Sequence, residues 1–359
     1  MMHILHVAGT NLAGIPGEFV VGHRERGNRS ELVTFGPSPY GFENGICLRY
    51  PWFGSSLSRA FKRTVRAERR VDLCDREKKD LDWRPRSWAE LVAIRFRDIL
   101  WERQARKALD RHGLWDYDLF HLDGGICFTY RTRLLRELIK REKRFVVFYY
   151  GTDLRVRGRL PEVEETASLL MTCEFDLLQR HPRLKFLPQP FDVSKFVPRE
   201  KENAILRICH SPTNRGAKGS DVIIAIVRKL EKSYPIQLML IEGLPHRQAL
   251  ALKATCDLAI EQVGNRAGTG YGMNSIETLA MGIPTLTELT TAFAQFISDH
   301  PFISVTEETL EEVLIQVIKN PDLRHRKARE GRVWVLKTHD RKAVMERLYE
   351  MYREAGIQV

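Results

Sequence analysis

Short apolar runs alternate with amphipathic stretches along the chain, and this alternation predicts layers of parallel strands and helices. The first run, residues 3–7, leads through a glycine-rich turn into a helical stretch at about residues 18–26 and then into a second run at residues 31–35. Strand, turn, helix and strand in this order begin a doubly wound sheet. Further strands are predicted in the first half at residues 118–122, 144–149, 169–173 and 185–187. We therefore expect one Rossmann-like domain in the first half of the chain.

The same alternation starts again after a polar, proline-rich stretch at residues 188–198, which is typical of an interdomain hinge. Strands are predicted at residues 206–210, 236–242 and 257–262, and helices at residues 221–230, 246–255, 309–317 and 341–355. A chain of 359 residues exceeds the usual size of a single core. We therefore expect two domains, residues 1–190 and 199–338, with a hinge at 191–198 and a terminal segment at 339–359.

Composition narrows the class of protein. The six cysteines are scattered without a C-x-x-C pair, so we expect reduced thiols and a cytoplasmic protein, with neither a zinc site nor a disulfide framework. No apolar run reaches the roughly 18 residues of a transmembrane helix. The formal net charge of +11 suggests an anionic partner, and nucleic acid, an anionic membrane surface and a phosphorylated ligand all fit it.

A glycine-rich loop precedes an apolar helix pattern in the second half. Gly268, Gly270 and Gly272 let a ligand approach the backbone closely, and the free N–H groups at the start of a helix suit an anion such as a diphosphate. Glu277 falls near the start of this helix and allows two interpretations. It either closes a capping box with Asn274 or accepts hydrogen bonds from a ribose.

A second loop carries two cations above the end of a predicted strand. Arg215 and Lys218 follow the strand at residues 206–210 and precede a helix that Ser220 is placed to cap. Arginine binds phosphate through a bidentate fork, and lysine binds it as a point charge. Both loops lie at strand ends, so they can converge on one ligand, although two solvated cations would also fit the pattern.

Two successive strands of the first half also end in polar residues. His121 and Asp123 end one strand, and Tyr150 and Asp153 follow the next. Ligand sites in doubly wound sheets lie beyond the carboxyl ends of strands, so these side chains are candidates for the wall of a site. A single histidine near a strand end is more often structural than catalytic, and both interpretations of His121 are open.

Residues 50–109 combine basic and aromatic side chains. Six cations lie between Arg59 and Arg70. A helical spacing is seen for Trp88, Leu91, Val92, Arg95 and Ile99. The pattern fits helices with a core face and a solvated basic face. It also fits a surface that meets an anionic membrane or acceptor, and it fits a nucleic-acid surface less well, because the sequence has no nucleic-acid-binding motif.

Residues 268–282, together with Ile283-Pro284-Thr285, resemble the donor-binding segment of GT-B-fold, family-4-like retaining glycosyltransferases (glycosyl transferases group 1). The resemblance implies an α/β fold of two Rossmann-like doubly wound domains that face each other across a cleft, with the terminal helix crossing back to the first domain. It implies that a nucleotide-diphospho-sugar binds mainly to the second domain and the acceptor to the first. It maps donor binding onto these residues: Gly14, Arg215, Lys218, Thr269, Gly270, Tyr271, Gly272 and Glu277.

By the same resemblance we expect a glycosyltransferase that transfers a sugar with retention of configuration, with His121, Asp153 and Lys218 at the catalytic site. The nucleotide-diphospho-sugar is its substrate, and we expect neither a metal nor a cofactor. The acceptor is unknown, and a lipid-linked molecule or a saccharide would fit. The expected location is the cytoplasm, and a peripheral position on the inner face of the membrane is also compatible with the basic segment.

Two other functions are kept open. Thr269 and Tyr150 stand where the family has an acidic residue and a histidine, which would suit a non-catalytic nucleotide-sugar-binding or partner subunit. The charge of +11 would suit a basic nucleic-acid-binding protein, which we consider the least favoured of the three.

Overall fold

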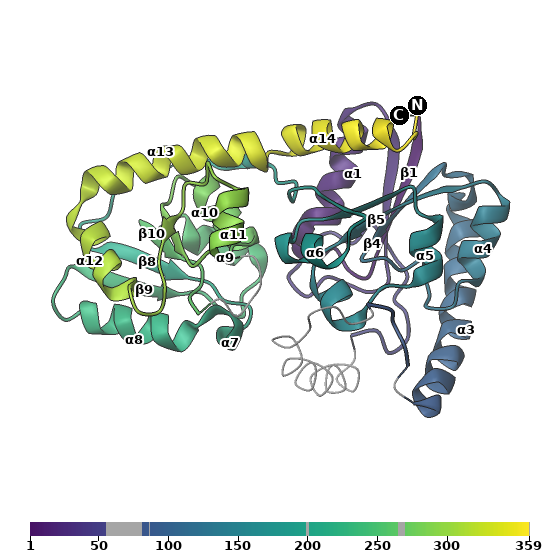
Figure 1. Cartoon of the computed structure of the whole chain (residues 1–359), viewed down its shortest axis with the longest axis horizontal. Helices are drawn as coiled ribbons and strands as arrows, with labels where there is room; N and C mark the ends of the chain where they lie inside the picture. The colour runs from purple at the N-terminus through teal and green to yellow at the C-terminus, as the bar shows by residue number, and fades with distance from the viewer. Residues whose placement is uncertain (55–80, 86, 199–200, 265–269, 359) are drawn as a thin grey trace. The chain divides into compact units, whose positions relative to one another are not determined.

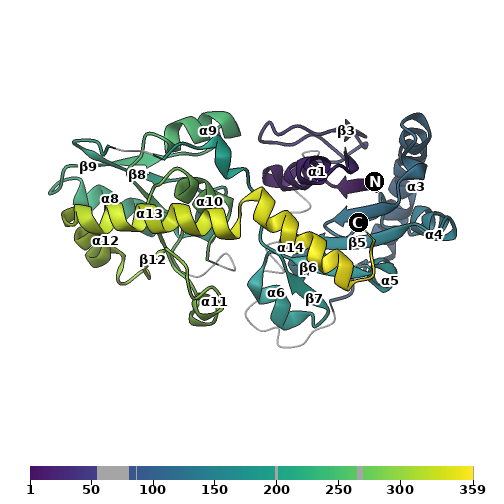
Figure 2. The same ribbon diagram turned by 90° about the horizontal axis from the view of Figure 1, so that it is seen from above.

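The chain divides into two compact units. The computed structural model describes residues 1–54, 81–85, 87–198, 201–264 and 270–358. The first unit consists of Met1–Pro188 together with Met345–Val359, and the second of Gln189–Val344. Each unit has its own parallel sheet with helices on both faces, as Figures 1 and 2 show. This confirms the α/β fold class predicted from the sequence, with two Rossmann-like units.

The sheet of the first unit has seven parallel strands in the order β3-β2-β1-β4-β5-β6-β7. The strands are β1 (His3–Ala8), β2 (Arg29–Thr34), β3 (Ile46–Cys47), β4 (Leu119–Asp123), β5 (Arg144–Tyr149), β6 (Leu169–Thr172) and β7 (Leu184–Phe186). The strand order reverses at β1, so right-handed connections on its two sides place helices on opposite faces. Accordingly, α1 (Ile15–Glu25) lies on one face, and α3 (Trp88–Arg111) and α4 (Arg133–Lys140) lie on the other (Figures 1 and 2). Two shorter helices complete the unit: α5 (Pro161–Thr166) and α6 (Phe175–Arg180).

Strand register brings the carboxyl ends of neighbouring strands together at one edge of this sheet. Asp123 at the end of β4 pairs with Ala8 in β1 and with Phe148 in β5. Tyr149 at the end of β5 pairs with Thr172 in β6. The polar residues that follow these strands therefore meet at one rim, as the sequence predicted.

Helix α1 begins at Ile15, three residues before the expected start. Its N-cap is Gly14, whose φ of 79° lies in the left-handed region, and Pro16 occupies the first turn, where its fixed φ and missing N–H fit a helix start. The last helix, α14 (Arg341–Glu354), packs on α1 from residue 345 onward. A Cβ at Gly22 of α1 would lie 2.5 Å from Cγ of Met345, so the glycine permits this close approach.

The second unit has a five-stranded parallel sheet in the order β12-β11-β10-β8-β9. Its strands are β8 (Leu206–His210), β9 (Ile236–Leu240), β10 (Leu258–Ile260), β11 (Thr285–Thr287) and β12 (Ile303–Ser304). Its helices are α7 (Arg215–Lys218), α8 (Ser220–Leu230), α9 (His246–Lys253), α10 (Met273–Ala280), α11 (Thr291–Phe296), α12 (Leu310–Lys319) and α13 (Pro321–Thr338). Helix α8 packs against α12, and α10 packs against α13.

The prediction that Ser220 caps α8 is wrong. Gly219 is the N-cap, in the left-handed region at φ 64°, and no described side chain caps the helix. Ser220 is instead the first residue of α8, and its hydroxyl lies 2.7 Å from Nε2 of buried His210. The Ser220 hydroxyl is therefore engaged with the His210 imidazole and not with the backbone N–H groups at the start of the helix.

The chain passes between the units after Pro188 and after Val344, and these two segments are tied together inside the second unit. The amide of Phe191 donates to the carbonyl of His339 at 2.8 Å, and the amide of Arg341 donates to the carbonyl of Phe191 at 2.9 Å. The stretch expected as a hinge, residues 191–198, thus begins with a short parallel bridge to the segment that enters α14.

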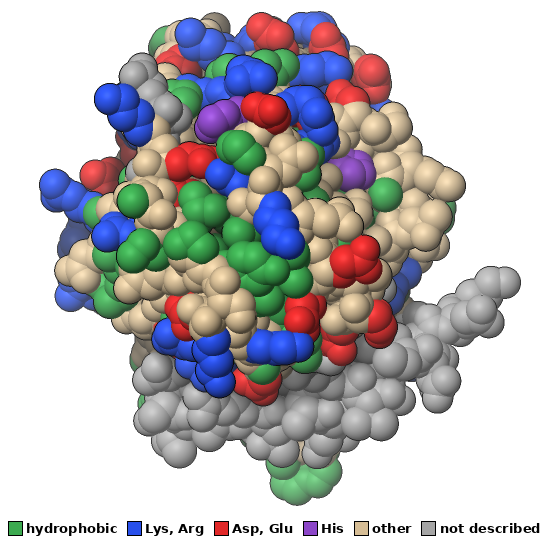
Figure 3. Space-filling view, turned by 90° about the vertical axis from the view of Figure 1, so that its left-hand side faces the viewer, with side chains coloured by type: hydrophobic (Ala, Val, Ile, Leu, Met, Phe, Trp, Pro, Cys, Tyr) green, Lys and Arg blue, Asp and Glu red, His purple; other side chains and the backbone are tan. Residues whose placement is uncertain are grey.

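Charge is mixed on the face drawn in Figure 3, where basic side chains lie among acidic and apolar ones. The excess of +11 is therefore not gathered into one basic surface on that face. Among the helices that the structure describes, none combines the length and the apolar character that a membrane span requires.

Candidate functional site

The loop after β8 places Lys218 against the end of β10. Asn214 caps the short helix α7, its side chain accepting from the amide of Ala217 at 3.0 Å. A glycine is required at position 219, because a Cβ there would lie 2.5 Å from the carbonyl oxygen of Val263. The amide of Val263 also donates to the carbonyl of Lys218 at 3.2 Å. The predicted cation loop and the end of β10 are therefore packed together.

The ammonium group of Lys218 is held by two polar side chains that follow β10. It pairs with a carboxylate oxygen of Glu261 and donates to Oε1 of Gln262 at 3.0 Å. Glu261 is only 3% exposed. Burial alone would raise the pKa of Glu261, but the charge of Lys218 and three hydrogen bonds outweigh it and lower the pKa to about 2. Glu261 is thus ionised at neutral pH.

Helix α10 begins next to the same carboxylate. Its N-cap is Gly272, and no side chain caps it. The Asn274 amide and the Ser275 hydroxyl instead donate to Oε2 of Glu261, each at 2.8 Å. The backbone N–H groups and the positive dipole end of α10 therefore have no side-chain cap among the described residues, an arrangement that suits an anion.

The capping-box interpretation of Glu277 is wrong. Glu277 lies in the middle of α10, and Asn274 is not the N-cap. The carboxylate is buried, with one oxygen 2.6 Å from Nζ of Lys253 and the other 2.6 Å from Nε2 of His246. Burial alone would raise the pKa of Glu277, but Lys253 and His246 hold it below its ordinary value. A ribose contact by Glu277 stays a prediction, with His246 as its half-buried neighbour.

Arg215 forms a bidentate pair with Glu242, which follows β9. Its Nε and Nη2 atoms lie 2.8 and 2.6 Å from the two carboxylate oxygens. The arginine side chain is half exposed, so this pair is a surface ion pair of the kind that contributes little to stability. A bound diphosphate could therefore replace Glu242 as the partner of the guanidinium with little loss of stability.

The described part of the glycine-rich loop is anchored to the rest of the second unit. Gly270 has a φ of 92°, and a Cβ there would lie 2.6 Å from the carbonyl oxygen of Glu288. Tyr271 turns inward, where its hydroxyl lies 3.1 Å from Nε2 of His339 and its ring stacks on Phe293. The backbone at Gly270–Gly272 is therefore fixed before any ligand binds. Gly268 and Thr269 lie outside the described residues.

At the rim of the first unit, Asp123 is the centre of a buried hydrogen-bond group. His6 Nδ1 and His121 Nδ1 lie 2.9 and 3.4 Å from its Oδ2, and the Tyr150 hydroxyl donates to Oδ1 at 2.5 Å. His121 has no exposed surface, so in this arrangement it touches Asp123 and neighbouring rings rather than solvent. The structural interpretation of His121 is the one that this geometry supports.

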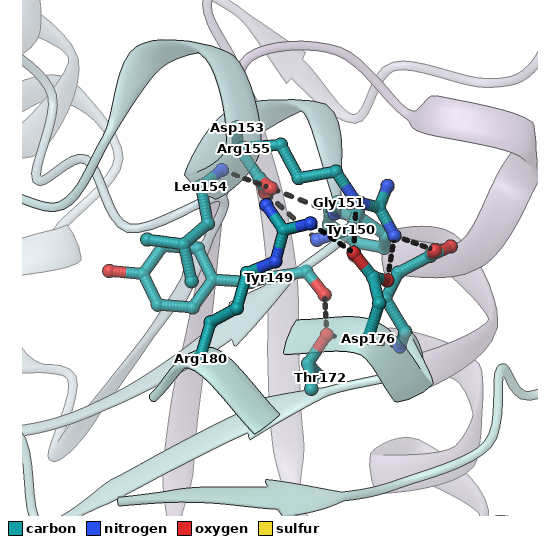
Figure 4. A network of polar contacts seen from close by, with 10 residues as sticks. Tyr149, Tyr150, Gly151, Asp153, Leu154, Arg155, Thr172, Asp176 and Arg180 are labelled. Carbon is teal, nitrogen blue, oxygen red and sulfur yellow. Dashed lines mark hydrogen bonds and ion pairs between the residues drawn. The ribbon is translucent and has the colours of Figure 1, made fainter. Parts of the chain in front are cut away.

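Asp153 closes its own turn (Figure 4). One carboxylate oxygen accepts from the amides of Gly151 and Leu154, both at 2.8 Å, and the other accepts from the amide of Tyr150 at 2.9 Å. Beside it, Arg155 pairs with Glu174 and Asp176. The charged groups at this rim are therefore engaged with one another, and a catalytic role for Asp153 stays a prediction.

One group among the described residues has the composition and spacing of a metal site. His6, His121 and Asp123 each offer one ligand atom within 4.8 Å of the others. Asp123 already accepts hydrogen bonds from both imidazoles, so we assign no metal to them. The sequence also contains two Asp-x-Asp tripeptides, at residues 80–82 and 116–118. Asp80 lies outside the described residues, and two of the described ones are engaged with protein groups: Asp82 pairs with Arg159, and Asp118 accepts from the amide of His3.

The glycine at position 14 has a local explanation. It is the left-handed N-cap of α1, and a Cβ there would lie 2.9 Å from the ring of Phe42. Its proposed position over a diphosphate stays a prediction. Glu261 and Gln262 were missed in the sequence, although a usable signal existed: two polar residues come directly after the buried strand Leu258–Ile260, at the edge where doubly wound sheets bind ligands.

No family model matches the chain, and no curated protein matches it. Solved structures do share its fold over nearly its whole length. The glycosyltransferase from Rickettsia africae superposes with a TM-score of 0.61 at 11% identity, covering 100% of this chain and 99% of the other. HepE of Anabaena, solved in complex with UDP-glucose, gives 0.58 at 12% identity, covering 99% and 100%. The N-terminal domain of trehalose-6-phosphate phosphatase from Candida albicans gives 0.59 at 12% identity, covering 98% and 97%.

These identities are too low to carry an activity from one protein to another, because one fold hosts many functions. What the likeness establishes is the architecture of this chain: an α/β protein with the GT-B fold.

Proposed function

We propose that this protein is a glycosyltransferase that uses a nucleotide-diphospho-sugar as its donor. The carrying observation is that Lys218 and the uncapped start of α10 are held next to each other by one carboxylate, Glu261. A cation and a helix N-terminus side by side are what a diphosphate requires. Two of the solved structures that share the fold are a glycosyltransferase from Rickettsia africae and HepE in complex with UDP-glucose, which supports the same reaction class.

In this proposal catalysis is mainly positioning and charge stabilisation. As the bond between the sugar and the diphosphate breaks, negative charge grows on the departing diphosphate. Lys218 and the start of α10 stabilise that charge, and Arg215 joins them after leaving Glu242. We propose that this requires no metal and that the sugar keeps its anomeric configuration.

The alternative is a subunit that binds nucleotide sugars without transferring them. Its motivation is the packing of the first unit, where Asp123, Asp153 and Arg155 are all engaged internally. Donor hydrolysis or sugar transfer by the purified protein, above the level of a Lys218→Ala variant, would remove this alternative. Nucleotide binding with no turnover on any acceptor would support it.

We also propose that the acceptor is met at an anionic membrane surface, and α3 is the element that supports this. Of the interpretations left open for this segment, a core face does not fit the first half of this helix. Trp88, Val92, Phe96 and Ile99 are 78%, 53%, 59% and 37% exposed, and they form one stripe at spacings of four, four and three residues. Monomeric soluble proteins rarely expose such a continuous apolar stripe.

The surroundings of the stripe favour a lipid surface over another protein. Arg84, Arg95 and Arg103 are exposed around it, while the carboxylate of Asp98 is buried and paired with Arg97. A helix with aromatic residues on one side and arginines beside them is typical of proteins that lie in the headgroup layer. The basic run from Arg59 to Arg70 lies outside the described residues. An acceptor carried in the membrane, such as a lipid-linked saccharide, would fit this surface.

A thermal-shift screen tests the donor proposal. A ligand that binds only the folded state raises the melting temperature, so UDP, GDP, ADP and their sugars can be compared on the purified protein. We expect one nucleoside diphosphate to raise the melting temperature and its nucleotide sugar to be hydrolysed or transferred. No shift with any nucleoside diphosphate or with pyrophosphate would contradict the proposed function.

A further inference from the structure

The two residues that follow β10 contact both Lys218 and the first turn of α10. Glu261 reaches Lys218 on the α7 loop and both Asn274 and Ser275 on the first turn of α10. The side-chain oxygen of Gln262 accepts a hydrogen bond from the same ammonium group at 3.0 Å. These contacts join segments that are 43 and 13 residues apart in the sequence. One dipeptide thus connects the two loops that the sequence singled out separately.

The contacts fix the direction of the lysine. An ammonium group has three N–H donors, and Lys218 uses two of them on Glu261 and Gln262. The lysine side chain is 19% exposed, so its remaining N–H is the one that a ligand can reach. A lysine is ordinarily a mobile point charge, and here two acceptors restrict it to one orientation.

Two buried polar atoms beside this pair lack a hydrogen-bond partner among the described residues. They are Nε2 of Gln262, a residue that is 1% exposed, and Oδ1 of Asn274. The amide orientation of Gln262 is settled by its neighbour, because Lys218 can only donate and must therefore face the oxygen. The unpartnered atom of Gln262 is consequently a donor. A buried donor without a partner lowers the stability of the folded protein, and an anionic ligand that accepts from it would relieve this loss.

Resting on the donor site proposed above, we infer that Glu261 is the positioning residue of the diphosphate site and that Gln262 is a further binding residue in it. Glu261 aims the remaining N–H of Lys218 and holds the first turn of α10, and the Gln262 amide donates to the same diphosphate. Anchors on two separate elements favour a ligand with two phosphates over one with a single phosphate. Glu261 itself touches protein groups only and acts through Lys218 and α10.

Three variants separate this role from a merely structural one: Glu261→Ala, Glu261→Gln and Gln262→Leu. Glu261→Gln can keep the geometry, because its oxygen can accept from Lys218 while its NH2 group faces Asn274, whose carbonyl now lacks a partner. Glu261→Ala removes both anchors, and Gln262→Leu removes the donor without leaving a buried charge. Glu202→Ala is the matched control, since it breaks the carboxylate–arginine pair with Arg324 elsewhere in the second unit.

The readout is calorimetric affinity for pyrophosphate and for orthophosphate, measured per folded molecule. We expect Glu261→Ala and Gln262→Leu to weaken pyrophosphate binding about tenfold or more, the loss of one hydrogen bond to a charged group. We expect Glu261→Gln to restore binding and Glu202→Ala to leave it unchanged. The preference for pyrophosphate over orthophosphate should shrink in Glu261→Ala and persist in Glu261→Gln.

Other outcomes overturn the inference. Wild-type affinity in Glu261→Ala and in Gln262→Leu would show that the dipeptide positions nothing. If Glu261→Ala and Glu261→Gln both bind pyrophosphate more tightly than the wild-type protein, and equally so, Glu261 only neutralises the charge of Lys218. If Glu261→Ala does not fold, Glu261→Gln and Gln262→Leu still decide. Failure of the wild-type protein to bind pyrophosphate or UDP is a different result, because it removes the donor site itself.

Discussion

The two units use the carboxyl ends of their strands in opposite ways. In the second unit, Glu261 and Gln262 hold Lys218 so that its charge faces outward beside the start of α10. In the first unit, Asp123 accepts hydrogen bonds from two buried histidines and from the partly buried Tyr150, so both of its oxygens are engaged within the unit. The same position in the same kind of sheet therefore serves a ligand site in one unit and a polar core in the other.

The difference lies in the partners. A carboxylate that holds a half-buried cation can present that cation to a ligand, whereas a carboxylate surrounded by imidazoles and a tyrosine is satisfied by them. Removing the carboxylate should accordingly have different consequences in the two units, namely loss of binding in the second and loss of stability in the first. Each of the following predictions tests one side of this contrast.

The largest effect is expected at the first rim. Asp123→Ala leaves His6, His121 and Tyr150 without their shared acceptor, and losing one member of a buried charged network costs roughly 3–5 kcal/mol. Urea unfolding should show this loss, while pyrophosphate affinity per folded molecule stays at the wild-type value. Wild-type stability in Asp123→Ala would mean that Asp123 is not the centre of this group.

Glu277→Ala should also destabilise the protein, because it leaves buried Lys253 unpaired. Its effect on ligands tests the ribose prediction. If Glu277 holds a ribose, UDP binding weakens by about tenfold or more while pyrophosphate binding does not change. Calorimetry with both ligands on the folded variant decides, and an equal change for both would count against a ribose contact.

Acid should weaken the first unit through its buried histidines. Burial, reinforced by His121, lowers the pKa of His6 to about 4, and burial lowers the pKa of His23 well below 6.5. Both histidines are neutral in the folded state, and above pH 6.5 they are also neutral in the unfolded chain. Their protonation therefore does not change the free energy of unfolding in that range. Below that pH the unfolded chain takes up protons first, and stability falls until pH 4, by up to about 3 kcal/mol from His6 alone.

Urea midpoints measured between pH 7 and pH 4.5 test this expectation. The urea midpoint should fall less steeply with decreasing pH in His6→Gln than in the wild-type protein. In His112→Gln, which changes an exposed histidine, it should fall as in the wild-type protein. An unchanged slope in His6→Gln would show that His6 is protonated in the folded state or does not control the acid response.

The smallest effect on stability is expected at α3, because Trp88 and Phe96 are largely exposed. Trp88→Ser combined with Phe96→Ser should reduce co-sedimentation with anionic liposomes, because aromatic side chains anchor a helix in the headgroup layer. The matched control is Val333→Ser combined with Leu336→Ser, which removes two exposed apolar side chains from α13. Binding to anionic but not neutral vesicles, weakened by salt, supports the membrane proposal, and absence of binding at low salt contradicts it.

The sequence predicted the fold from periodicity, because apolar runs of strand length alternate with amphipathic stretches in both units. Helix ends were harder to predict. Gly14 and Pro16 start α1 before its apolar pattern begins, and Ser220 joins a buried histidine instead of capping α8. Capping depends on which partner lies nearby in space, and that information is absent from local sequence.

The candidate site was predicted by position and not by pairing. The cation loop and the start of α10, where the described end of the glycine-rich loop lies, do meet at the end of β10, as the strand-end rule predicts. The sequence could not show that Glu261 joins them, because the contact spans 43 residues. Nor could it show that the apolar stripe of α3 faces solvent, because a helical pattern defines a face without saying what covers it.

The most direct test of the central claim is the affinity of the Lys218→Ala variant for the nucleoside diphosphate that the wild-type protein binds, with Lys229→Ala as the control. Lys229 also pairs with a glutamate, Glu311, but lies on the surface of α8 away from the loops. We predict that Lys218→Ala folds but unfolds at a lower urea concentration, because buried Glu261 loses its cation. Per folded molecule it should lose roughly 1.5–3 kcal/mol of binding free energy, while Lys229→Ala binds normally. Unchanged affinity in a folded Lys218→Ala variant would contradict the assignment of the diphosphate site to the end of β10.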